Sequence, residues 1–217
     1  MIGQFRKVTA IVLLTISSIA CVPIGQLQHT KIEPSENPRK GVINVDSRAT
    51  GVPKGSTGML QFLFIPIANT RLEGDSSASI MKSVREAVKA AGYNANKNPA
   101  YTAIDAAYLK THVKKIKFGN FLALNTANIV LHHRLVSREG ALLWEGETES
   151  WVSSSHRNYD RTAESAMNEQ MSEMIELFSS EAFYQATLRI SEHNKFLEEP
   201  NEKQSVKQSN KLDPKAP

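Results

Sequence analysis

Cys21 is the only cysteine in this chain of 217 residues, and it directly follows a short apolar segment. Arg6 and Lys7 precede an uncharged run, Val8 to Ala20, that is rich in Ile, Leu and Val. This run is too short to span a bilayer, which needs about 20 apolar residues. A basic start, a short apolar segment and small residues before a cleavage point are typical of a secretory signal peptide. With one cysteine, an internal disulfide is impossible, so the thiol is free, modified or bonded to another molecule.

The tetrapeptide Ser18-Ile19-Ala20-Cys21 resembles the lipobox of bacterial lipoproteins, with Ser18 in place of the usual Leu. By that resemblance, the Cys21 thiol receives a diacylglycerol, the chain is cut before Cys21 and the new amine is acylated. Stable membrane attachment requires two lipid chains or more. We therefore predict a lipoprotein signal peptide over residues 1–20 and lipid attachment at Cys21. The alternatives are an ordinary signal peptide with an incidental cysteine, or an uncleaved anchor.

Val22 follows the cysteine, at a position where Asp favours retention in the inner membrane of Gram-negative bacteria. By resemblance to that sorting rule, we expect a lipid-anchored protein of the outer membrane that faces the periplasm. The net charge of +4 falls to about +2 without Arg6 and Lys7. No cluster of Lys and Arg with interleaved aromatic residues appears, so nucleic acid is not an expected partner.

Composition divides the remaining chain into three parts. Residues 21–40 hold the lipidated cysteine and then prolines and polar residues without a helical or strand period, which indicates a flexible tether. Such a coil spans about 25 Å. Residues 41–195 are predicted to form a single α+β domain, and the polar stretch 196–217 is expected to be a disordered tail.

The first half of the domain contains two expected strands and one helix. Residues 41–46 form a short strand, and the apolar run 59–67 predicts a strand buried on both faces that ends at Pro66. Asp75 can cap a helix that ends at Gly92. The apolar positions of this helix recur at helical spacing: Ile80, Val84, Val88 and Ala91.

The second half begins with a long strand and a hairpin. In the strand that starts at residue 106, a slip in the apolar phase predicts a bulge near Lys114-Lys115, and the lysines are expected on a solvated face. Residues 128–136 and 141–152 form the hairpin. A four-residue loop pairs Val136 with Ala141 and keeps the two faces distinct. A three-residue loop with a bulge at Gly140 would shift the pairing by one and mix the faces, so we favour the longer loop.

Residues Asp160 to about Ile190 are predicted to form one long helix. Met167, Met171 and Met174 lie on its apolar stripe, and Met81 lies on the first helix. Methionines can bind copper or form a pliable binding face, but we interpret these as core. Together, the elements predict an α+β domain with a largely antiparallel sheet of about four to six strands and two helices packed mainly on one face.

No complete catalytic, metal or cofactor site is found in the sequence. The stretch Lys54–Gly58 lacks the Gly-Lys order and the following helix of a phosphate-binding loop. His132 and His133 are adjacent in a strand and point to opposite faces, so they cannot share a metal without a kink. His112, His132 and Glu145 could converge on one face, but exposed strand histidines beside a glutamate are the interpretation that we prefer.

Two further polar groups have a functional and a plain interpretation. Ser153-Ser154-Ser155-His156 with Asp160 contains the residue types of a hydrolytic triad but lacks the sharp turn that exposes a nucleophile. Glu145, Glu147 and Glu149 share one strand face, as in a solvated stripe, whereas glycosidase chemistry would need one of them buried. We therefore expect no enzymatic activity, no cofactor and no metal.

The order of these elements resembles that of small periplasmic lipoproteins related to the YajG, LpoB, CsgG and TolB N-terminal group. The resemblance covers roughly residues 41–190 and rests on four stretches: Val45-Asp46-Ser47-Arg48, Ala91-Gly92-Tyr93, Ile104 to Leu109 and Glu139 to Trp144. It implies a sheet backed by helices and a non-enzymatic part in an envelope machine. No binding residue is transferred, because no family motif for one is present.

The sequence thus predicts an outer-membrane lipoprotein that acts as an accessory or adaptor in envelope assembly, secretion or transport, through a protein partner in the envelope. One alternative is a carrier of a lipid or glycan ligand, which needs a sizeable apolar pocket between helices and sheet. The other is an envelope hydrolase that uses Ser155 or His156.

Overall fold

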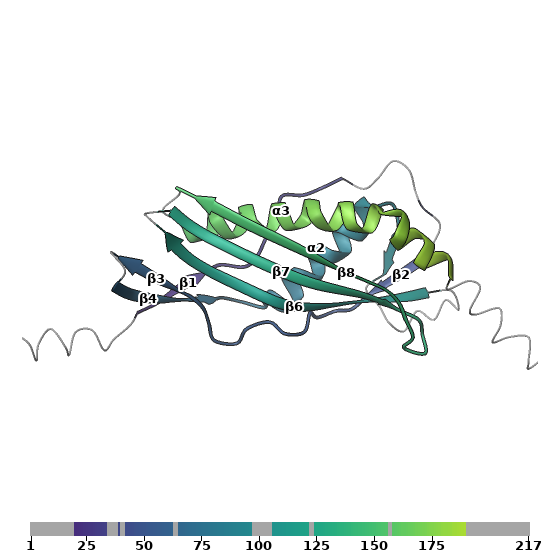
Figure 1. The fold of residues 1–217 in the computed structure, drawn as a ribbon, viewed down its shortest axis with the longest axis horizontal. Coiled ribbons are helices and arrows are strands. Elements are labelled where there is room, and N and C mark those ends of the chain that lie inside the picture. Colours follow the sequence, from purple (N-terminus) through teal and green to yellow (C-terminus); the bar gives the residue numbers. More distant parts are fainter. Residues whose placement is uncertain are drawn as a thin grey trace, which may run out of the picture.

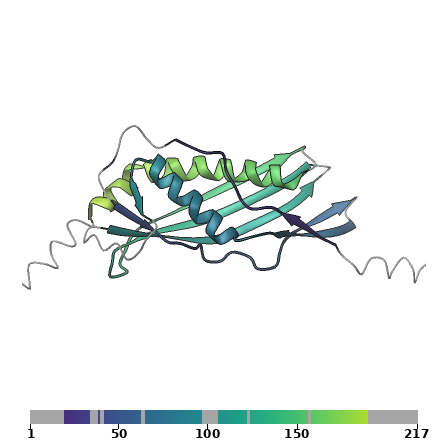
Figure 2. The same cartoon turned by 180° about the vertical axis from the view of Figure 1, so that it is seen from behind.

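The structure is a computed structural model that describes residues 20–33, 39, 42–62, 65–96, 106–121, 124–155 and 158–189. The predicted signal peptide, apart from Ala20, and the predicted tail 196–217 lie outside the described residues. The described residues form one eight-stranded sheet with the helices on one of its faces (Figures 1 and 2). Its strands are β1 (Ala20–Ile24), β2 (Val42–Val45), β3 (Ser56–Phe62), β4 (Ile65–Leu72), β5 (Asn94–Asn96), β6 (Ala106–Phe121), β7 (Leu124–Val136) and β8 (Leu142–Ser154).

The sheet is mixed, which corrects the prediction of a largely antiparallel sheet of four to six strands. The hairpin pairs β3–β4, β6–β7 and β7–β8 are antiparallel, but β1–β4, β2–β5, β2–β6 and β3–β6 are parallel. The length of β6 explains the difference. One edge of β6 pairs with β7 along its whole length, while β2 and β3 share the other edge at its two ends. Such pairings between distant segments leave no local pattern in the sequence.

The apolar run 59–67 forms two strands and not the single buried strand that we predicted. β3 and β4 pair as a hairpin, and Pro66 is an exposed residue near the start of β4. Met59 is 45% exposed, so the strand is not buried on both faces. A register shift between Leu60 and Gln61 accommodates Pro66, which has no N–H to donate to the ladder.

Helix α2 (Ser76–Ala90) agrees with the prediction at both ends. The Asp75 side chain accepts a hydrogen bond from the Ala78 N–H at 3.1 Å, as an N-cap does. At the other end, Gly92 has a φ of 95°, and the Tyr93 N–H donates to the Val88 carbonyl at 3.1 Å. The predicted stripe is buried: Ile80, Val84, Val88 and Ala91.

Helix α3 (Tyr159–Ser179) stops short of the predicted end, and a separate helical segment covers residues 181–189. Three helical segments therefore stand in the described part of the chain, where two were predicted. Ser180 breaks the helix with an extended ψ of 151°, and its Oγ accepts from the Phe183 N–H at 3.3 Å. The break lets Phe183 pack edge-on against Trp144 and Tyr93, with centroid distances of 4.8 and 5.4 Å.

The β6–β7–β8 region confirms the predicted bulge and corrects the predicted register. The β6–β7 register shifts between Val113 and Lys115. In the hairpin, the Gly140 N–H donates to the Ser137 carbonyl at 3.0 Å and Gly140 has a φ of 88°, so the loop is the three-residue form that we disfavoured. A second register shift, at Leu143, then moves the pairing by one more residue, so the residues after it point to the same faces as in the predicted register. From Trp144 onward the two faces are therefore as predicted, but His133 pairs with Gly146 in place of Trp144. Leu142, predicted on the apolar face opposite Leu135, instead pairs with Val136 and is 46% exposed.

The core lies between the sheet and the helices. The predicted methionines belong to it, since Met81, Met167, Met171 and Met174 are fully buried. Among the described residues, no group of His, Cys, Asp and Glu is arranged to hold a metal. No helix in the described part of the chain has the length and apolarity to cross a membrane.

Candidate functional site

The predicted lipid-attachment residue, Cys21, lies in strand β1, not in a tether. β1 runs parallel to β4, with Cys21 opposite Asn69. Alternation along the strand exposes Cys21 and Pro23 and buries Ile24, as expected for a strand with one covered face. The Cys21 thiol is free and exposed.

The chain after β1 is also held against the domain. Leu27 is 1% exposed. The Gly25 N–H donates to Asp160 Oδ1 at 2.8 Å, and the Thr30 N–H donates to Asn168 Oδ1 at 2.7 Å, so both contacts are to α3. Over residues 21–33 the expected flexible tether is therefore replaced by packed chain. The apolar residues that decide this are two isolated positions, Ile24 and Leu27, which make no periodic pattern.

We call the sheet face opposite the helices the outer face. Directly paired residues point to the same side of a sheet, and one row of pairs crosses several strands. Cys21 pairs with Asn69, Asn69 with Met59, and Met59 with Gly119. Three strand spacings separate Cys21 from Gly119, or about 14 Å. Cys21 therefore shares the outer face with the centre of the sheet.

A cavity of about 830 Å³ opens on the outer face between β3 and β6. Lys114, Lys115 and Lys117 line it together with Met59 and Asn120, and its lining includes no Asp or Glu. We call it the basic groove. It exists because β3 and β6 pair at only two positions and diverge beyond them.

Side chains and a glycine hold the two walls of the basic groove together. Asn120 substitutes for the missing ladder bonds: its Oδ1 accepts from the Gln61 N–H at 2.7 Å and its Nδ2 donates to the Gln61 carbonyl at 2.6 Å. Gly58 permits the close approach, because a Cβ there would lie 1.6 Å from the Phe118 carbonyl oxygen. The Tyr159 hydroxyl donates to the Gly119 carbonyl at 3.4 Å, and burial raises its pKa to about 12, so it stays protonated.

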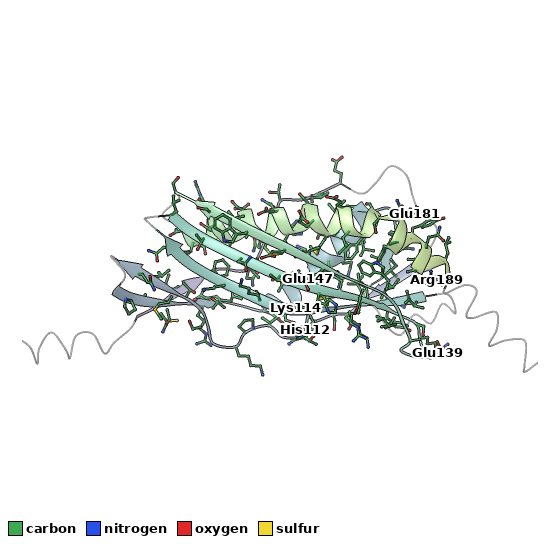
Figure 3. The ribbon with its side chains drawn as sticks, in the orientation of Figure 1. His112, Lys114, Glu139, Glu147, Glu181 and Arg189 are labelled. Carbon is green, nitrogen blue, oxygen red and sulfur yellow. The ribbon has the colours of Figure 1, made fainter. Side chains whose placement is uncertain are left out.

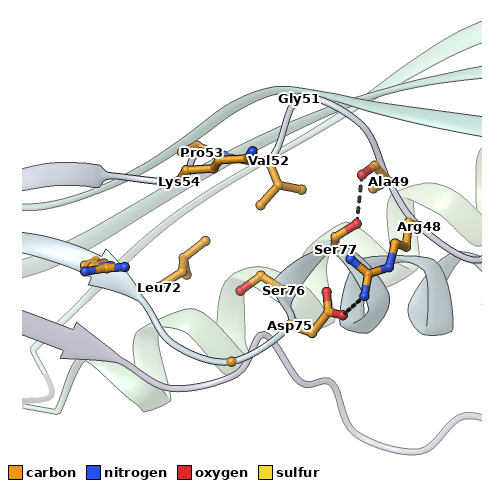
Figure 4. A pocket seen from close by; sticks show the side chains of 12 residues that line it. Arg48, Ala49, Gly51, Val52, Pro53, Lys54, Leu72, Asp75, Ser76 and Ser77 are labelled. Carbon is orange, nitrogen blue, oxygen red and sulfur yellow. Dashed lines mark hydrogen bonds and ion pairs between the residues drawn. The ribbon is translucent and has the colours of Figure 1, made fainter.

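A second cavity, of about 470 Å³, lies at the start of α2 (Figure 4). Arg48, Lys54 and Arg71 bring positive charge to it. Asp75 balances part of this charge through its ion pair with Arg48 at 2.8 Å. The Ser77 hydroxyl, which also lines the cavity, donates to the Ala49 carbonyl at 2.8 Å.

The histidine and glutamate residues of the predicted polar face do lie together on the outer face. His112 pairs with His132 across β6 and β7, and His132 Nε2 is 3.6 Å from Glu145 Oε2. Lys114 forms an ion pair with Glu147, and both are labelled in Figure 3. The Asn128 amide donates to Glu149 at 2.8 Å. Neighbouring polar groups thus engage the three glutamates, which are all exposed.

The residues of the hydrolase alternative are not brought together within the described structure. Ser155 is exposed, and Asp160 accepts the Gly25 N–H. His156 lies outside the described residues. The loop Lys54–Gly58 leads into strand β3 and not into a helix. It therefore lacks the helix that follows a phosphate-binding loop.

A buried polar chain between sheet and α3 was missed by the sequence analysis. His133 Nδ1 lies 3.0 Å from Thr111 Oγ1, and its Nε2 lies 3.2 Å from Thr148 Oγ1. The Gln170 amide donates to the same threonine. Burial, with a smaller contribution from His132, lowers the pKa of His133 from 6.5 to about 3. His133 is therefore a neutral structural residue near pH 7.

The chain was compared with protein-family models, curated proteins and solved structures, and similarity was found to solved structures. No protein-family model matches, and no curated protein is similar in sequence. Among solved structures, a Xanthomonas campestris protein of family DUF330 matches with a TM-score of 0.50 and 11% identity over 80% of this chain and 98% of its own. The PelC dodecamer of Paraburkholderia phytofirmans gives 0.42 and 12% over 68% and 93%. A lipoprotein of Neisseria meningitidis gives 0.36 and 13% over 57% and 90%.

The similarity to the Xanthomonas campestris protein shows that a related arrangement of strands and helices occurs in another bacterial protein. At 11% identity, the likeness to the DUF330 protein shows the fold alone. The resemblance to the YajG, LpoB, CsgG and TolB group is not confirmed by these matches.

Proposed function

We propose that this protein is a lipoprotein, anchored through Cys21 in the outer membrane and facing the periplasm, that serves an envelope machine as a non-enzymatic accessory or adaptor. One observation carries the proposal. The exposed Cys21 thiol begins the packed chain and directly follows a segment that reads as a lipoprotein signal peptide. The partner is a protein of an assembly, secretion or transport machine in the envelope.

The lipid anchor is tested by metabolic labelling with palmitate. The unchanged chain should incorporate label and fractionate with membranes, whereas Cys21→Ala should do neither. Label that persists in Cys21→Ala would overturn the anchor. Sorting is tested by Val22→Asp, which should move the protein to the inner-membrane fraction, with Val22→Asn as the matched control.

The adaptor role is tested by photo-crosslinking in cells. Trp151 is 61% exposed on β8, and β8 pairs only with β7 among the described strands, so a crosslinker at position 151 samples a free sheet edge. Position 173 on α3 is an exposed control. We expect one specific protein adduct that is lost in Cys21→Ala. Recovery of abundant lipoproteins alone, from both positions, would contradict an adaptor role.

The packing between the helices and the sheet favours the adaptor over the ligand carrier. It needs an apolar pocket between helices and sheet, but bulky side chains fill this space: Phe118, Phe178 and Phe183 are fully buried. The basic groove and the α2 cavity lie at the surface and have many polar lining residues. A lipid or glycan that co-purifies in stoichiometric amount with the protein would reverse this preference.

A further inference from the structure

The side of the domain that faces the membrane follows from where Cys21 lies. This inference rests on the proposed lipid anchor. A flexible tether would let the domain turn freely, but residues 20–33 lie against the domain, and Gly25 and Thr30 donate hydrogen bonds to α3. A lipid on Cys21 would therefore hold the sheet close to the bilayer. Cys21 points to the outer face, so this face, not the helical one, lies nearest the lipid.

Charge on the outer face is unevenly distributed. Gly119, which lines the basic groove, lies three strand spacings, or about 14 Å, from Cys21, and the lining of the groove contains three lysines and no carboxylate. The acidic stripe Glu145, Glu147 and Glu149 is on β8, which lies five strand spacings from β1, or about 24 Å measured across the strands. The strands near the anchor therefore carry an excess of basic residues, whereas β8 carries three glutamates, with Arg134 of β7 opposite Glu145.

Two of the groove lysines are available for a partner. Lys114 forms an ion pair with Glu147, but within the described ranges neither the Lys115 amine nor the Lys117 amine forms one. Arg71 adds a third charge on the same face, opposite Pro23 in β1, and lines a cavity of about 680 Å³ with Cys21. Glu73 also lines this cavity and offsets part of that charge.

We propose that the outer face between β1 and β6 is a membrane-docking surface, with the basic groove receiving the phosphates of anionic lipid headgroups. The lysines supply the charge, and the exposed Met59 supplies an apolar contact beside them. The glutamates of β8 lie farther from the anchor and gain nothing from the same headgroups, so β8 and the helices stay open to the periplasm. The lipid on Cys21 keeps the domain close to the bilayer, and the lysines determine which face of the domain is turned toward it.

The test uses the lipidated protein, isolated from cells and reconstituted in vesicles. Since the Cys21 thiol is blocked by lipid, a single added cysteine can carry a fluorophore. Gln61→Cys lies on the rim of the basic groove, and Glu173→Cys lies on α3 as the control; both positions are exposed. Quenching by headgroup-labelled lipid is compared in vesicles of phosphatidylcholine alone and with one part in four of phosphatidylglycerol.

We expect strong quenching at position 61 and weak quenching at position 173 in anionic vesicles, and a smaller difference in neutral ones. Lys115→Gln with Lys117→Gln should lower the ratio of docked to free orientation by about 30-fold, the effect of two basic residues near an anionic surface. Lys82→Gln with Lys89→Gln removes the same charge from exposed positions on α2 and should change little.

Two results would overturn the docking surface: equal quenching at positions 61 and 173, or an equal effect of the two lysine pairs. Failure of the lipid anchor gives a different result. Mass spectrometry would then show no lipid on Cys21, and the protein would not be recovered with vesicles at all.

Discussion

At the scale of single residues, the most consequential group is His133. It is fully buried between Thr111 and Thr148, against the ring of Phe178 at 5.2 Å. Its pKa is lowered to about 3, whereas the unfolded chain has the usual 6.5. Below pH 6.5 the imidazole therefore binds a proton in the unfolded state but not in the folded state. The folded state loses stability as the pH falls.

We predict that the free energy of unfolding decreases between pH 6.5 and pH 4 by up to about 1.4 kcal/mol per pH unit from this group. Urea unfolding at several pH values measures it. His133→Leu should be less stable at pH 7, because two threonine hydroxyls lose a partner, but should lose much of the pH dependence. His132→Gln, on the outer face, should keep it. An unchanged slope in His133→Leu would show that other groups cause the acid sensitivity.

Gly58 and Gly55 form a natural pair for a second prediction. A Cβ at Gly58 would overlap the Phe118 carbonyl oxygen, whereas a Cβ at Gly55 would meet nothing within 4 Å. Gly58→Ala should destabilise the protein by about 2 kcal/mol or more, because β3 must move away from β6. Gly55→Ala should stay within about 0.5 kcal/mol. Similar melting temperatures for the two variants would argue against the β3–β6 contact.

At the scale of elements, β1 and the segment that follows it decide where the domain begins. Ile24 and Leu27 are buried in the same core as the helices. Replacing either with Ala should cost about 2–4 kcal/mol. The exposed neighbours Gln26 and Gln28 are matched controls and should change stability by less than about 0.5 kcal/mol. The midpoints of chemical denaturation of the four variants measure these differences. Equal midpoints for all four would show that Ile24 and Leu27 are not packed in the core, as in a flexible tether.

For the molecule as a whole, the packing of residues 21–33 against the domain would couple a lipid anchor on Cys21 to the orientation of the domain. A Gly/Ser spacer of about 20 residues between Cys21 and Val22 would add a mean reach of about 25 Å, more than the Debye length of about 10 Å at 0.1 M salt. We predict that the spacer leaves the lipid on Cys21 and the fold intact but reduces headgroup quenching at position 61. Circular dichroism and the vesicle assay measure the two effects. Quenching that does not change with the spacer would mean that the lysines hold the face without help from a short anchor.

Local patterns in the sequence determined several elements correctly. They are helix α2 with Asp75 and Gly92 at its ends, the bulge beside Lys114, and the two faces of β6 and β7. All of them depend on neighbours within a few positions. Capping bonds, helical stripes and strand alternation are interactions of that range. The basic start, the apolar run and Cys21 are likewise a local pattern, and they carry the prediction of a lipid anchor.

Only the tertiary structure decided how these pieces combine. The parallel pairs β1–β4, β2–β6 and β3–β6 join segments tens of residues apart, and each depends on chain closure and burial that no local spacing records. The β1–β4 pair makes residues 20–24 a strand where a tether was predicted, and the short β3–β6 pair leaves the basic groove between these two strands. The sequence predicts an anchor at Cys21; the long-range pairing places Cys21 and three lysines on one face of the sheet.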